Sequence, residues 1–394
     1  MDFHYCTIAA RNYLPKTLAL YHSIQEQSPH IGLSILLLDD EVPTALRDLP
    51  GLTFVDPQTL FGRPHHFHEL ATIYDVVELS TAVKPLLLQY LLGTYEGVAY
   101  LDPDTYLLSP LRELPDLVEE HSVVLTPHFL RPIPPASSYM SEIHSLTVGI
   151  YNLGFIAVGR AALPFLQWWW SHLENECLIY PLLGLFVDQK WIDAGTVYFP
   201  LHALRHEGYN VGPWNLHERP IRQGLDGVYH SGADALRLFH FSGFDLSRPE
   251  ELSSRLSEST AQLLVDNDAL KGLCRSYADV LRECVSTLGE GGPYRFGVDS
   301  RGNRLSTRVR RAYRADRVRE DKTQLPSPFA LEEAGAFASW KRGTQRARAK
   351  QLLADAAIAG KYVFPDEFKK LRSAMPKRAT AWRASLLRAG RVRR

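Results

Sequence analysis

The stretch that decides the fold runs from Gly97 to Leu107 and reads Gly-Val-Ala-Tyr-Leu-Asp-Pro-Asp-Thr-Tyr-Leu. The apolar run Val98 to Leu101 follows a glycine, a pattern typical of a fully buried strand in a parallel sheet. Asp102 and Asp104 come at the carboxyl end of this strand, which is the edge where open α/β sheets bind ligands. Pro103 disfavours the α conformation for Asp102, so the chain is expected to stay extended between the two acids.

Two carboxylates this close repel each other unless a cation lies between them. Mg²⁺ or Mn²⁺ typically takes one or two carboxylates together with the phosphate oxygens of a substrate. Asp102 and Asp104 therefore indicate a metal and diphosphate site. A solvated Asp-Pro-Asp turn is the alternative interpretation.

Further apolar runs predict the rest of an α/β fold with a mainly parallel sheet. The expected strands are Phe3 to Ala9, Leu33 to Leu38, Thr53 to Val55, Ser122 to Thr126, Tyr151 to Val158 and Val197 to Phe199. Helix-sized segments separate most of them, a rhythm typical of nucleotide-binding domains. No Gly-x-Gly-x-x-Gly turn follows the first strand, which argues against a dinucleotide cofactor.

Composition indicates a globular protein without a membrane span. Hydrophobic residues make up 45% of the 394 positions, enough for a large core. The longest apolar run, Leu178 to Val187, contains Pro181 and is shorter than the ~20 residues that a spanning helix needs. The chain begins directly with a strand, without a basic leader, and its cysteines lack CxxC spacing, so we expect a cytoplasmic protein. The cysteines are Cys6, Cys177, Cys274 and Cys284.

Charge divides the chain into an acidic body and a basic tail. Residues 1–300 hold 19 basic and 36 acidic residues, whereas residues 301–394 hold 25 basic and 8 acidic residues. We place a catalytic domain at residues 1–250 and a mostly helical extension at residues 251–394. Residues 376–394 form a basic amphipathic helix in this interpretation, which either packs on the acidic body or contacts the inner face of the membrane. Nucleic-acid binding is not expected, because the tail has few aromatics for stacking.

Four sequence blocks resemble, in order, the motifs of GT-A nucleotide-sugar transferases. The blocks are Tyr100-Leu101-Asp102-Pro103-Asp104, Tyr151-Asn152-Leu153-Gly154, Val187-Asp188-Gln189 and Phe239-His240-Phe241-Ser242-Gly243. The chain is most similar to glycosyltransferase family 8, the retaining group that includes glycogenin and bacterial lipopolysaccharide galactosyltransferases. The resemblance covers about residues 1–250 and implies a GT-A fold, with a mixed, mainly parallel sheet flanked by helices.

The resemblance assigns a metal site and a sugar site. Asp102, Asp104 and His240 match the metal ligands, a donor set that suits Mn²⁺ at least as well as Mg²⁺. Lys84 matches a basic residue near the metal and the donor, with an ordinary surface lysine as the alternative. The residues matching contacts to the donor sugar and its anomeric carbon are Asn152, Asp188 and Gln189. For Asp188 the alternative is a helix cap.

The resemblance also assigns the nucleotide end of the donor. The end of the first strand, from Thr7 through Ala9 to Tyr13, matches the segment that holds the base, with Arg11 or Tyr13 stacking on it. Family members usually carry an acid where Arg11 and Asn12 stand. They also commonly carry a phosphate-binding lysine three residues after the glycine that corresponds to Gly243. Here that position is Leu246, and Arg248 is the expected substitute.

By resemblance, the chain is a metal-dependent glycosyltransferase of polysaccharide biosynthesis. It would move a sugar from a UDP-sugar to a glycan, glycolipid or protein acceptor with retention, and residues 127–145 and 201–235 would shape the acceptor pocket. Asp193 replaces an asparagine that is frequent in the family. The family's specificity for a particular donor sugar therefore cannot be assigned to this chain. Gln189 is a poor nucleophile, which favours front-face attack by the acceptor.

Two other classes fit parts of the sequence. Asp102-Pro103-Asp104-Thr105 is similar to the Asp-x-Asp-x-Thr pattern of haloacid-dehalogenase-like phosphatases, in which the first aspartate is the nucleophile, although Thr105 stands one position earlier than the threonine of that pattern. That motif normally follows the first strand of its domain, whereas about a hundred residues precede it here. A non-catalytic sugar-binding module on the same fold is the third option, and it is disfavoured by the intact set of metal ligands.

Overall fold

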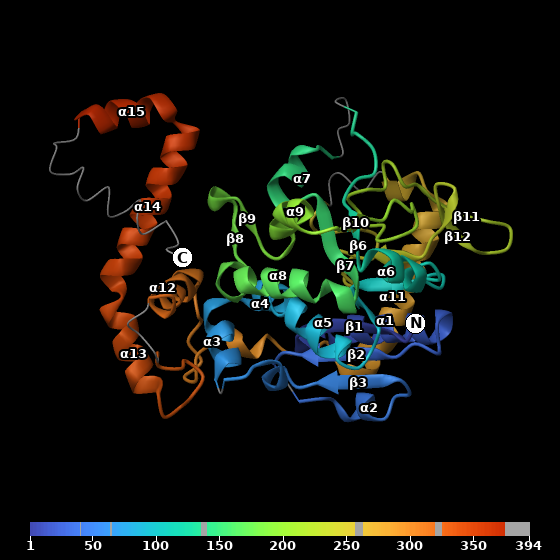
Figure 1. The fold of residues 1–394 in the computed structure, drawn as a ribbon, viewed down its shortest axis with the longest axis horizontal. Helices are drawn as coiled ribbons and strands as arrows, with labels where there is room; N and C mark the ends of the chain where they lie inside the picture. The colour runs from blue at the N-terminus through green and yellow to red at the C-terminus, as the bar shows by residue number, and fades with distance from the viewer. Residues whose placement is uncertain (40, 64, 135–139, 257–262, 320–324, 375–394) are drawn as a thin grey trace. The chain divides into compact units, whose positions relative to one another are not determined.

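The computed structural model describes residues 1–39, 41–63, 65–134, 140–256, 263–319 and 325–374 (Figure 1). It divides into two compact units. The first comprises Met1–Phe67, Val76–Ile179 and Leu185–Arg295, and the second comprises His68–Asp75, Tyr180–Gly184 and Phe296–Arg394. The first unit thus extends beyond the expected domain boundary at residue 250. The expected helix at 376–394 lies outside the described residues.

A seven-stranded mixed sheet forms the centre of the first unit, in the order β10-β6-β7-β4-β1-β2-β3. Its strands are β1 (Phe3–Ala9), β2 (Leu33–Leu37), β3 (Leu52–Val55), β4 (Gly97–Leu101), β6 (Val123–Pro127), β7 (Tyr151–Gly159) and β10 (His202–Ala203). Strand β7 runs antiparallel to β4 and β6, and the other pairs are parallel. The α/β class with a mixed, mainly parallel sheet is confirmed.

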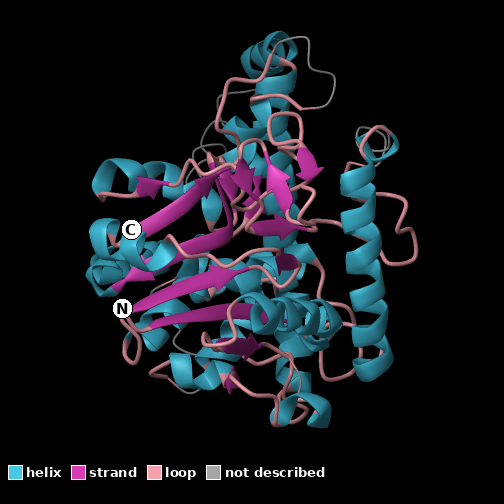
Figure 2. Cartoon of the chain, turned by 90° about the vertical axis from the view of Figure 1, so that its right-hand side faces the viewer, coloured by secondary structure: helices cyan, strands magenta, loops and turns pink. Residues whose placement is uncertain are grey.

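Helices cover both faces of this sheet (Figure 2). Every residue of β1, β2 and β4 is buried, which a strand achieves only when both faces are covered. The helices of the first unit that pack on strands or on one another include α1 (Leu14–Gln27), α5 (Lys84–Leu92), α6 (Leu114–His121), α8 (Leu163–Glu176), α9 (Gln189–Tyr198) and α11 (Asp268–Leu288). Pro15 occupies the first turn of α1, where proline's missing N–H costs nothing.

The remaining elements are shorter. The helices are α2 (Thr44–Arg47), α3 (His66–Ile73), α4 (Val76–Ala82) and α7 (Ile143–Val148), and the strands are β5 (Thr105–Leu107), β8 (Ile179–Tyr180), β9 (Leu185–Phe186), β11 (Ile221–Gln223), β12 (Tyr229–Ser231), β13 (Asp234–Ala235) and β14 (Leu238–His240). No helix in the described part of the chain has both the length and the apolarity needed to cross a bilayer.

The expected strand at Val197–Phe199 is wrong. Helix α9 continues through Tyr198, and the next strand of the sheet begins only at His202. The short β-branched and aromatic run favours a strand locally. However, Val197 and Tyr198 are mostly exposed, so this run is the solvent side of the last helical turn and not a buried strand.

The second unit is mostly helical, as expected for the extension. Its helices are α12 (Thr307–Arg317), α13 (Ala334–Gly343), α14 (Gln345–Val363) and α15 (Pro365–Ala374). Buried Arg310 of α12 ties together the segments of this unit. Its guanidinium donates to the carbonyls of Ala71 (2.7 Å), Thr72 (3.3 Å), Tyr74 (2.5 Å) and Phe296 (2.7 Å). These bonds join residues 68–75 to α12 across more than two hundred residues of sequence.

We expect Arg310→Met to destabilise the second unit by about 3 kcal/mol, because it leaves buried carbonyls without donors. Hydrogen exchange measured by mass spectrometry should show faster exchange in residues 68–75 and 296–319. Arg308→Met is the control, because Arg308 lies on the same helix and is exposed. Equal exchange in the two variants would show that Arg310 does not hold this unit together.

Candidate metal and diphosphate site

Three side chains predicted as metal ligands converge at one end of the sheet. Asp102 and Asp104 lie in the turn between β4 and β5, and β14 pairs antiparallel with β5 so that His240 lies opposite Thr105. One ligand atom from each of Asp102, Asp104 and His240 lies within 4.8 Å of the others. His240 Nε2 is 3.1 Å from an oxygen of Asp104 and 3.7 Å from one of Asp102. The expected trio is therefore brought together.

Backbone and side-chain hydrogen bonds fix the two acids. The Asp102 N–H donates to the Gly154 carbonyl at 2.8 Å, and the Phe241 N–H donates to the Asp104 carbonyl at 2.8 Å. The Tyr100 hydroxyl donates to Asp102 Oδ1 at 2.7 Å. Asp102 is thus anchored to β7, and Asp104 to the segment that carries the histidine. Both carboxylates are held in position before any ion binds.

Asn210 sets the orientation of the His240 ring. Its amide nitrogen donates to Thr126 Oγ1 (2.8 Å) and to Asn152 Oδ1 (3.0 Å), which leaves its oxygen to accept from His240 Nδ1 at 3.1 Å. With the ring proton on Nδ1, the Nε2 lone pair faces the two acids. Asn210 has a φ of 50°, a left-handed conformation that asparagine tolerates better than most residues.

The electrostatics suit a divalent cation. Burial by itself would raise the pKa of Asp104, but His240, Lys16 and Arg255 together hold it below its usual range. Asp104 is therefore ionised at neutral pH. Two carboxylates and one neutral imidazole form a donor set that fits Mn²⁺ or Mg²⁺. Within the described residues, no other group of three acids, histidines or cysteines is arranged for an ion.

A buried ion pair lies behind the metal ligands. Lys84 Nζ is 2.7 Å from Asp188 Oδ2, and both side chains are at most 2% exposed. Lys84 also donates to the Leu153 carbonyl at 2.7 Å and lies 4.2 Å from the centre of the Tyr100 ring. Because the ammonium is fully enclosed, Lys84 is not an ordinary surface lysine. Burial raises the pKa of Asp188, whereas Lys84 acts in the opposite direction.

Asp188 stands at the N-cap position of α9 but makes no capping hydrogen bond, so the helix-cap alternative is wrong. Its backbone carbonyl accepts from Trp169 Nε1 at 3.1 Å. Gln189 follows it, and its amide donates to the Val148 carbonyl at 2.8 Å. Val187, just before them, has a φ of 40°, a costly conformation for a β-branched residue. The chain is therefore strained where it presents this pair.

Asn152 connects β7 to the hydrogen bonds around His240 and His128. Its side-chain oxygen accepts from the Gly154 N–H at 3.0 Å and from Asn210. Its amide nitrogen donates to His128 Nε2 at 3.3 Å. Burial lowers the pKa of His128 to about 3, so this ring stays neutral and remains an acceptor at neutral pH. Sequence reasoning missed His128 and Asn210, which stand in no recognised motif.

The segment expected to hold the base begins inside the sheet. Thr7 and Ala9 are buried in β1, and Thr7 Oγ1 has no hydrogen-bond partner within the part of the chain that the structure describes. The Arg11 N–H donates to Asp39 Oδ1 at 2.8 Å, which places an acid beside this segment from the end of β2. Burial raises the pKa of Tyr13 to about 12, and the nearby carboxylate of Asp104 adds to this effect. Within this segment, Tyr13 is therefore the residue whose pKa is affected by the candidate metal ligands.

Two basic side chains that the sequence analysis did not single out contact the turn after His240. Gly243 has a φ of 76°, and a Cβ there would lie 2.6 Å from Ser253 Oγ. Arg255 Nη1 donates to Ser242 Oγ at 3.3 Å, and Lys16 Nζ donates to the Phe244 carbonyl at 3.1 Å.

Arg248, the expected phosphate contact, is oriented by acids of its own segment. It is half exposed and forms ion pairs with Asp245 (3.5 Å) and Glu251 (3.0 Å). By contrast, the positive charges of Arg255 and Lys16 both help to lower the pKa of Asp104. These two side chains are therefore the better candidates for phosphate contacts.

Comparison with known proteins gives distant relatives. No family model matches the chain. It is 25% identical over 268 residues to the uncharacterized protein YfnF of Bacillus subtilis (strain 168), covering 66% of this chain and 87% of YfnF. It is 24% identical over 271 residues to YfnD of the same strain, covering 64% of this chain and 81% of YfnD, which is also uncharacterized.

Three of the solved structures that the chain matches are glycosyltransferases. The galactosyltransferase LgtC, in complex with donor and acceptor sugar analogues, has a TM-score of 0.41 and 14% identity, over 71% of this chain and 95% of LgtC. GlyE of Streptococcus pneumoniae TIGR4 has a TM-score of 0.38 and 12% identity, over 76% and 67% of the two chains. The bifunctional WbbM has a TM-score of 0.34 and 17% identity, over 53% of this chain and 40% of WbbM.

We expect Gly154→Ala to weaken Mn²⁺ binding at least tenfold. An added Cβ would lie 2.4 Å from His240 Cε1 and 2.6 Å from Nδ1, so the imidazole must move away from the acids. Isothermal titration of the full chain with Mn²⁺ measures this. Gly62→Ala is the matched control, because nothing lies within 4 Å of its added Cβ. Equal Mn²⁺ affinity in the two variants would contradict a site that uses His240.

Proposed function

We propose that this protein is a metal-dependent glycosyltransferase that takes its sugar from a nucleotide donor, with a UDP-sugar favoured. The convergence of Asp102, Asp104 and His240 beside the buried Lys84–Asp188 pair carries the proposal. Such a site could bind the cation that accompanies a diphosphate, and it places a buried carboxylate beside that cation. The acceptor would be a glycan, a glycolipid or a protein, and the motifs' resemblance to a retaining family favours retention.

A divalent ion bound by the trio would act as a Lewis acid that eases departure of the diphosphate. The chain's own cations complete the charge balance. Arg255 and Lys16, held against the turn at Ser242 to Phe244, would contact phosphate oxygens directly. Tyr13, whose ring lies 4.9 Å from Lys16 Nζ, would stack on the base at the far end of the same donor.

Asp188 would stabilise positive charge that develops at the anomeric carbon. A fully buried carboxylate acts in a low dielectric, where its field is strong, and the fixed Lys84 prevents it from reorienting. Asn152 would orient the sugar hydroxyls, since its own position is fixed by Gly154 and Asn210. Gln189 lacks a nucleophilic atom of useful strength, which supports direct front-face attack by the acceptor.

A cavity of about 360 Å³ near α7 is the proposed acceptor pocket. Its lining residues are Phe129, Leu130, Arg131, Pro132, Glu142, Ser145 and Leu146. A run of ring contacts links it to the metal ligands: Phe129 to His128 (6.2 Å), His128 to Trp214 (6.0 Å) and Trp214 to His240 (5.2 Å). Aromatic surfaces with nearby charged groups suit a sugar acceptor.

The activity is tested by incubating the full chain and Mn²⁺ with a panel of nucleotide sugars and measuring nucleotide release. We expect release from a UDP-sugar that is abolished by EDTA and reduced at least about 100-fold by Asp188→Asn. Anomeric NMR of the product tests retention. Release of phosphate from a simple phosphoester, with no cleavage of any nucleotide sugar, would contradict the proposal and favour the phosphatase alternative.

The phosphate contact is tested by two matched arginine variants. We expect Arg255→Gln to raise the KM for the donor about tenfold, because it removes one charge-assisted hydrogen bond. Arg248→Gln should leave the KM nearly unchanged, since its guanidinium is oriented by Asp245 and Glu251. The reverse pattern would identify Arg248 as the phosphate contact.

A further inference from the structure

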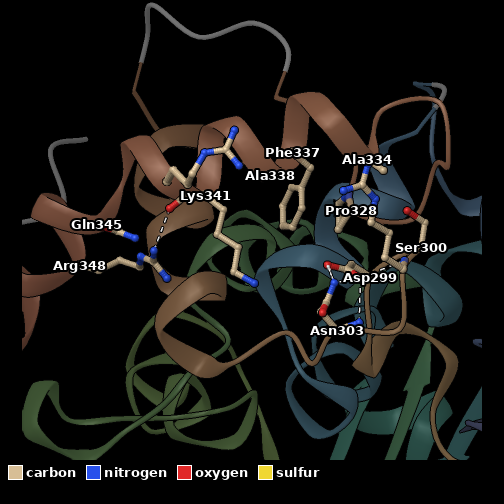
Figure 3. Close-up of a pocket in the computed structure, with 12 residues that line it drawn as sticks. Asp299, Ser300, Asn303, Pro328, Ala334, Phe337, Ala338, Lys341, Gln345 and Arg348 are labelled. Carbon is tan, nitrogen blue, oxygen red and sulfur yellow. Dashed lines mark hydrogen bonds between the residues drawn. The ribbon is translucent and has the colours of Figure 1, made fainter.

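The second unit contains a separate cavity of about 230 Å³ (Figure 3). It lies between the turn at Asp299–Asn303, helix α13 and the beginning of α14. Its lining residues are Asp299, Ser300, Arg301, Asn303, Pro328, Ala334, Phe337, Ala338, Lys341, Arg342, Gln345 and Arg348. All of them belong to the second unit, so the cavity is complete without the catalytic site.

The lining carries an excess of positive charge. Arg301, Lys341, Arg342 and Arg348 are basic, and Asp299 is the one acid among the lining residues. Asp299 Oδ1 is already occupied, because it accepts from the backbone N–H of Arg301 (3.0 Å) and Asn303 (2.9 Å) and from the Asn303 amide (3.1 Å). This carboxylate therefore holds the turn in shape and does not pair with the basic side chains.

Two of these cations have unused donors. Among the described residues, the Lys341 ammonium makes neither an ion pair nor a hydrogen bond. Arg348 Nη2 donates to the Lys341 carbonyl at 2.8 Å, but its buried Nε has no partner. Figure 3 shows Lys341 extending between Arg348 on one side and the Asp299–Asn303 turn on the other. A buried, unpaired charged donor is costly unless a ligand satisfies it.

The other side of the cavity is apolar. Phe337 and Ala334 of α13 are almost fully buried, and Pro328 borders them. The cavity thus pairs a cationic wall with a small apolar floor. This combination suits a compact anion that carries an organic stem better than it suits a neutral sugar or a metal ion.

We propose that this cavity binds a phosphate group, with Lys341 and Arg348 as its principal contacts. A tetrahedral oxyanion accepts hydrogen bonds in several directions, which matches a rotatable ammonium beside a planar guanidinium. The bound charge also relieves the repulsion among the four basic side chains. The phosphate belongs either to a soluble phosphate ester or diphosphate or to a phospholipid headgroup. This inference does not depend on the proposed transferase activity.

Isothermal titration of the full chain with inorganic pyrophosphate in EDTA at low salt tests the proposal. We expect binding that Lys341→Gln weakens about tenfold or more, because a charge-assisted contact is lost. Lys341→Gln removes no internal hydrogen bond of the described residues, so folding should persist. Lys350→Gln is the control, since it removes the same charge from an exposed position of the next helix, α14, that does not line the cavity.

Hydrogen exchange locates the site independently of the variants. Pyrophosphate should protect residues 296–303 and 334–348, and Arg348→Gln should abolish this protection. Sedimentation with phosphatidic acid vesicles, with phosphatidylcholine vesicles as reference, separates the two sources of phosphate. Capture by phosphatidic acid that pyrophosphate reverses identifies the headgroup, and pyrophosphate binding without capture identifies a soluble ligand. The proposal is overturned if no phosphate source binds, or if Lys341→Gln and Lys350→Gln bind equally.

Discussion

The repulsion between the carboxylates of Asp102 and Asp104 is the main constraint that the fold of the first unit must satisfy at the candidate site. Folding places two carboxylates in one short turn and brings His240 within 3.1 Å of Asp104. The backbone of β7 and the pairing of β5 with β14 hold this arrangement. An isolated pair of acids would move apart, so the surrounding sheet supplies the energy that keeps them together. A divalent ion bound between the two carboxylates, as proposed above, would offset this repulsion.

The second organising interaction is the enclosed Lys84–Asp188 pair. Buried ion pairs contribute little net stability, because desolvation offsets their attraction, yet loss of one partner is strongly destabilising. Tyr100 connects this pair to the metal ligands, since its ring lies against Lys84 and its hydroxyl donates to Asp102. The protein therefore fixes charges of both signs in a continuous network along the end of the sheet. Such fixed charges are what electrostatic stabilisation of a transition state requires.

The three candidate metal ligands were predicted before the structure was known. Asp102 and Asp104 were predictable because they follow a buried strand at the ligand-binding edge of the sheet, whereas His240 was predicted only from the resemblance of its motif to that of glycosyltransferase family 8. Most strands of the sheet were also predictable from apolar runs, and its mixed, mainly parallel order followed from the same resemblance.

Contacts that depend on loop conformation were not predictable. Asn210 acts through a left-handed backbone conformation, Lys16 reaches the turn after His240 from the distant helix α1, and Arg255 reaches it from the segment that follows. The expected strand at Val197–Phe199 failed because local strand propensity ignored the helix that began at Gln189. Helix α11 joins the first unit because its apolar residues, among them Tyr277, pack on the aromatic rings around β14, such as Phe241, which lies 3.7 Å away. Polar faces in the sequence alone suggested a separate extension.

The position of the ion tests the central claim most directly. Crystals of the full chain grown with Mn²⁺ and UDP should give an anomalous scattering peak at the manganese edge between Asp102, Asp104 and His240. We predict one carboxylate oxygen from each aspartate and Nε2 of the histidine within coordination distance of that peak. Manganese bound elsewhere, or UDP bound with no metal between these three residues, would contradict it.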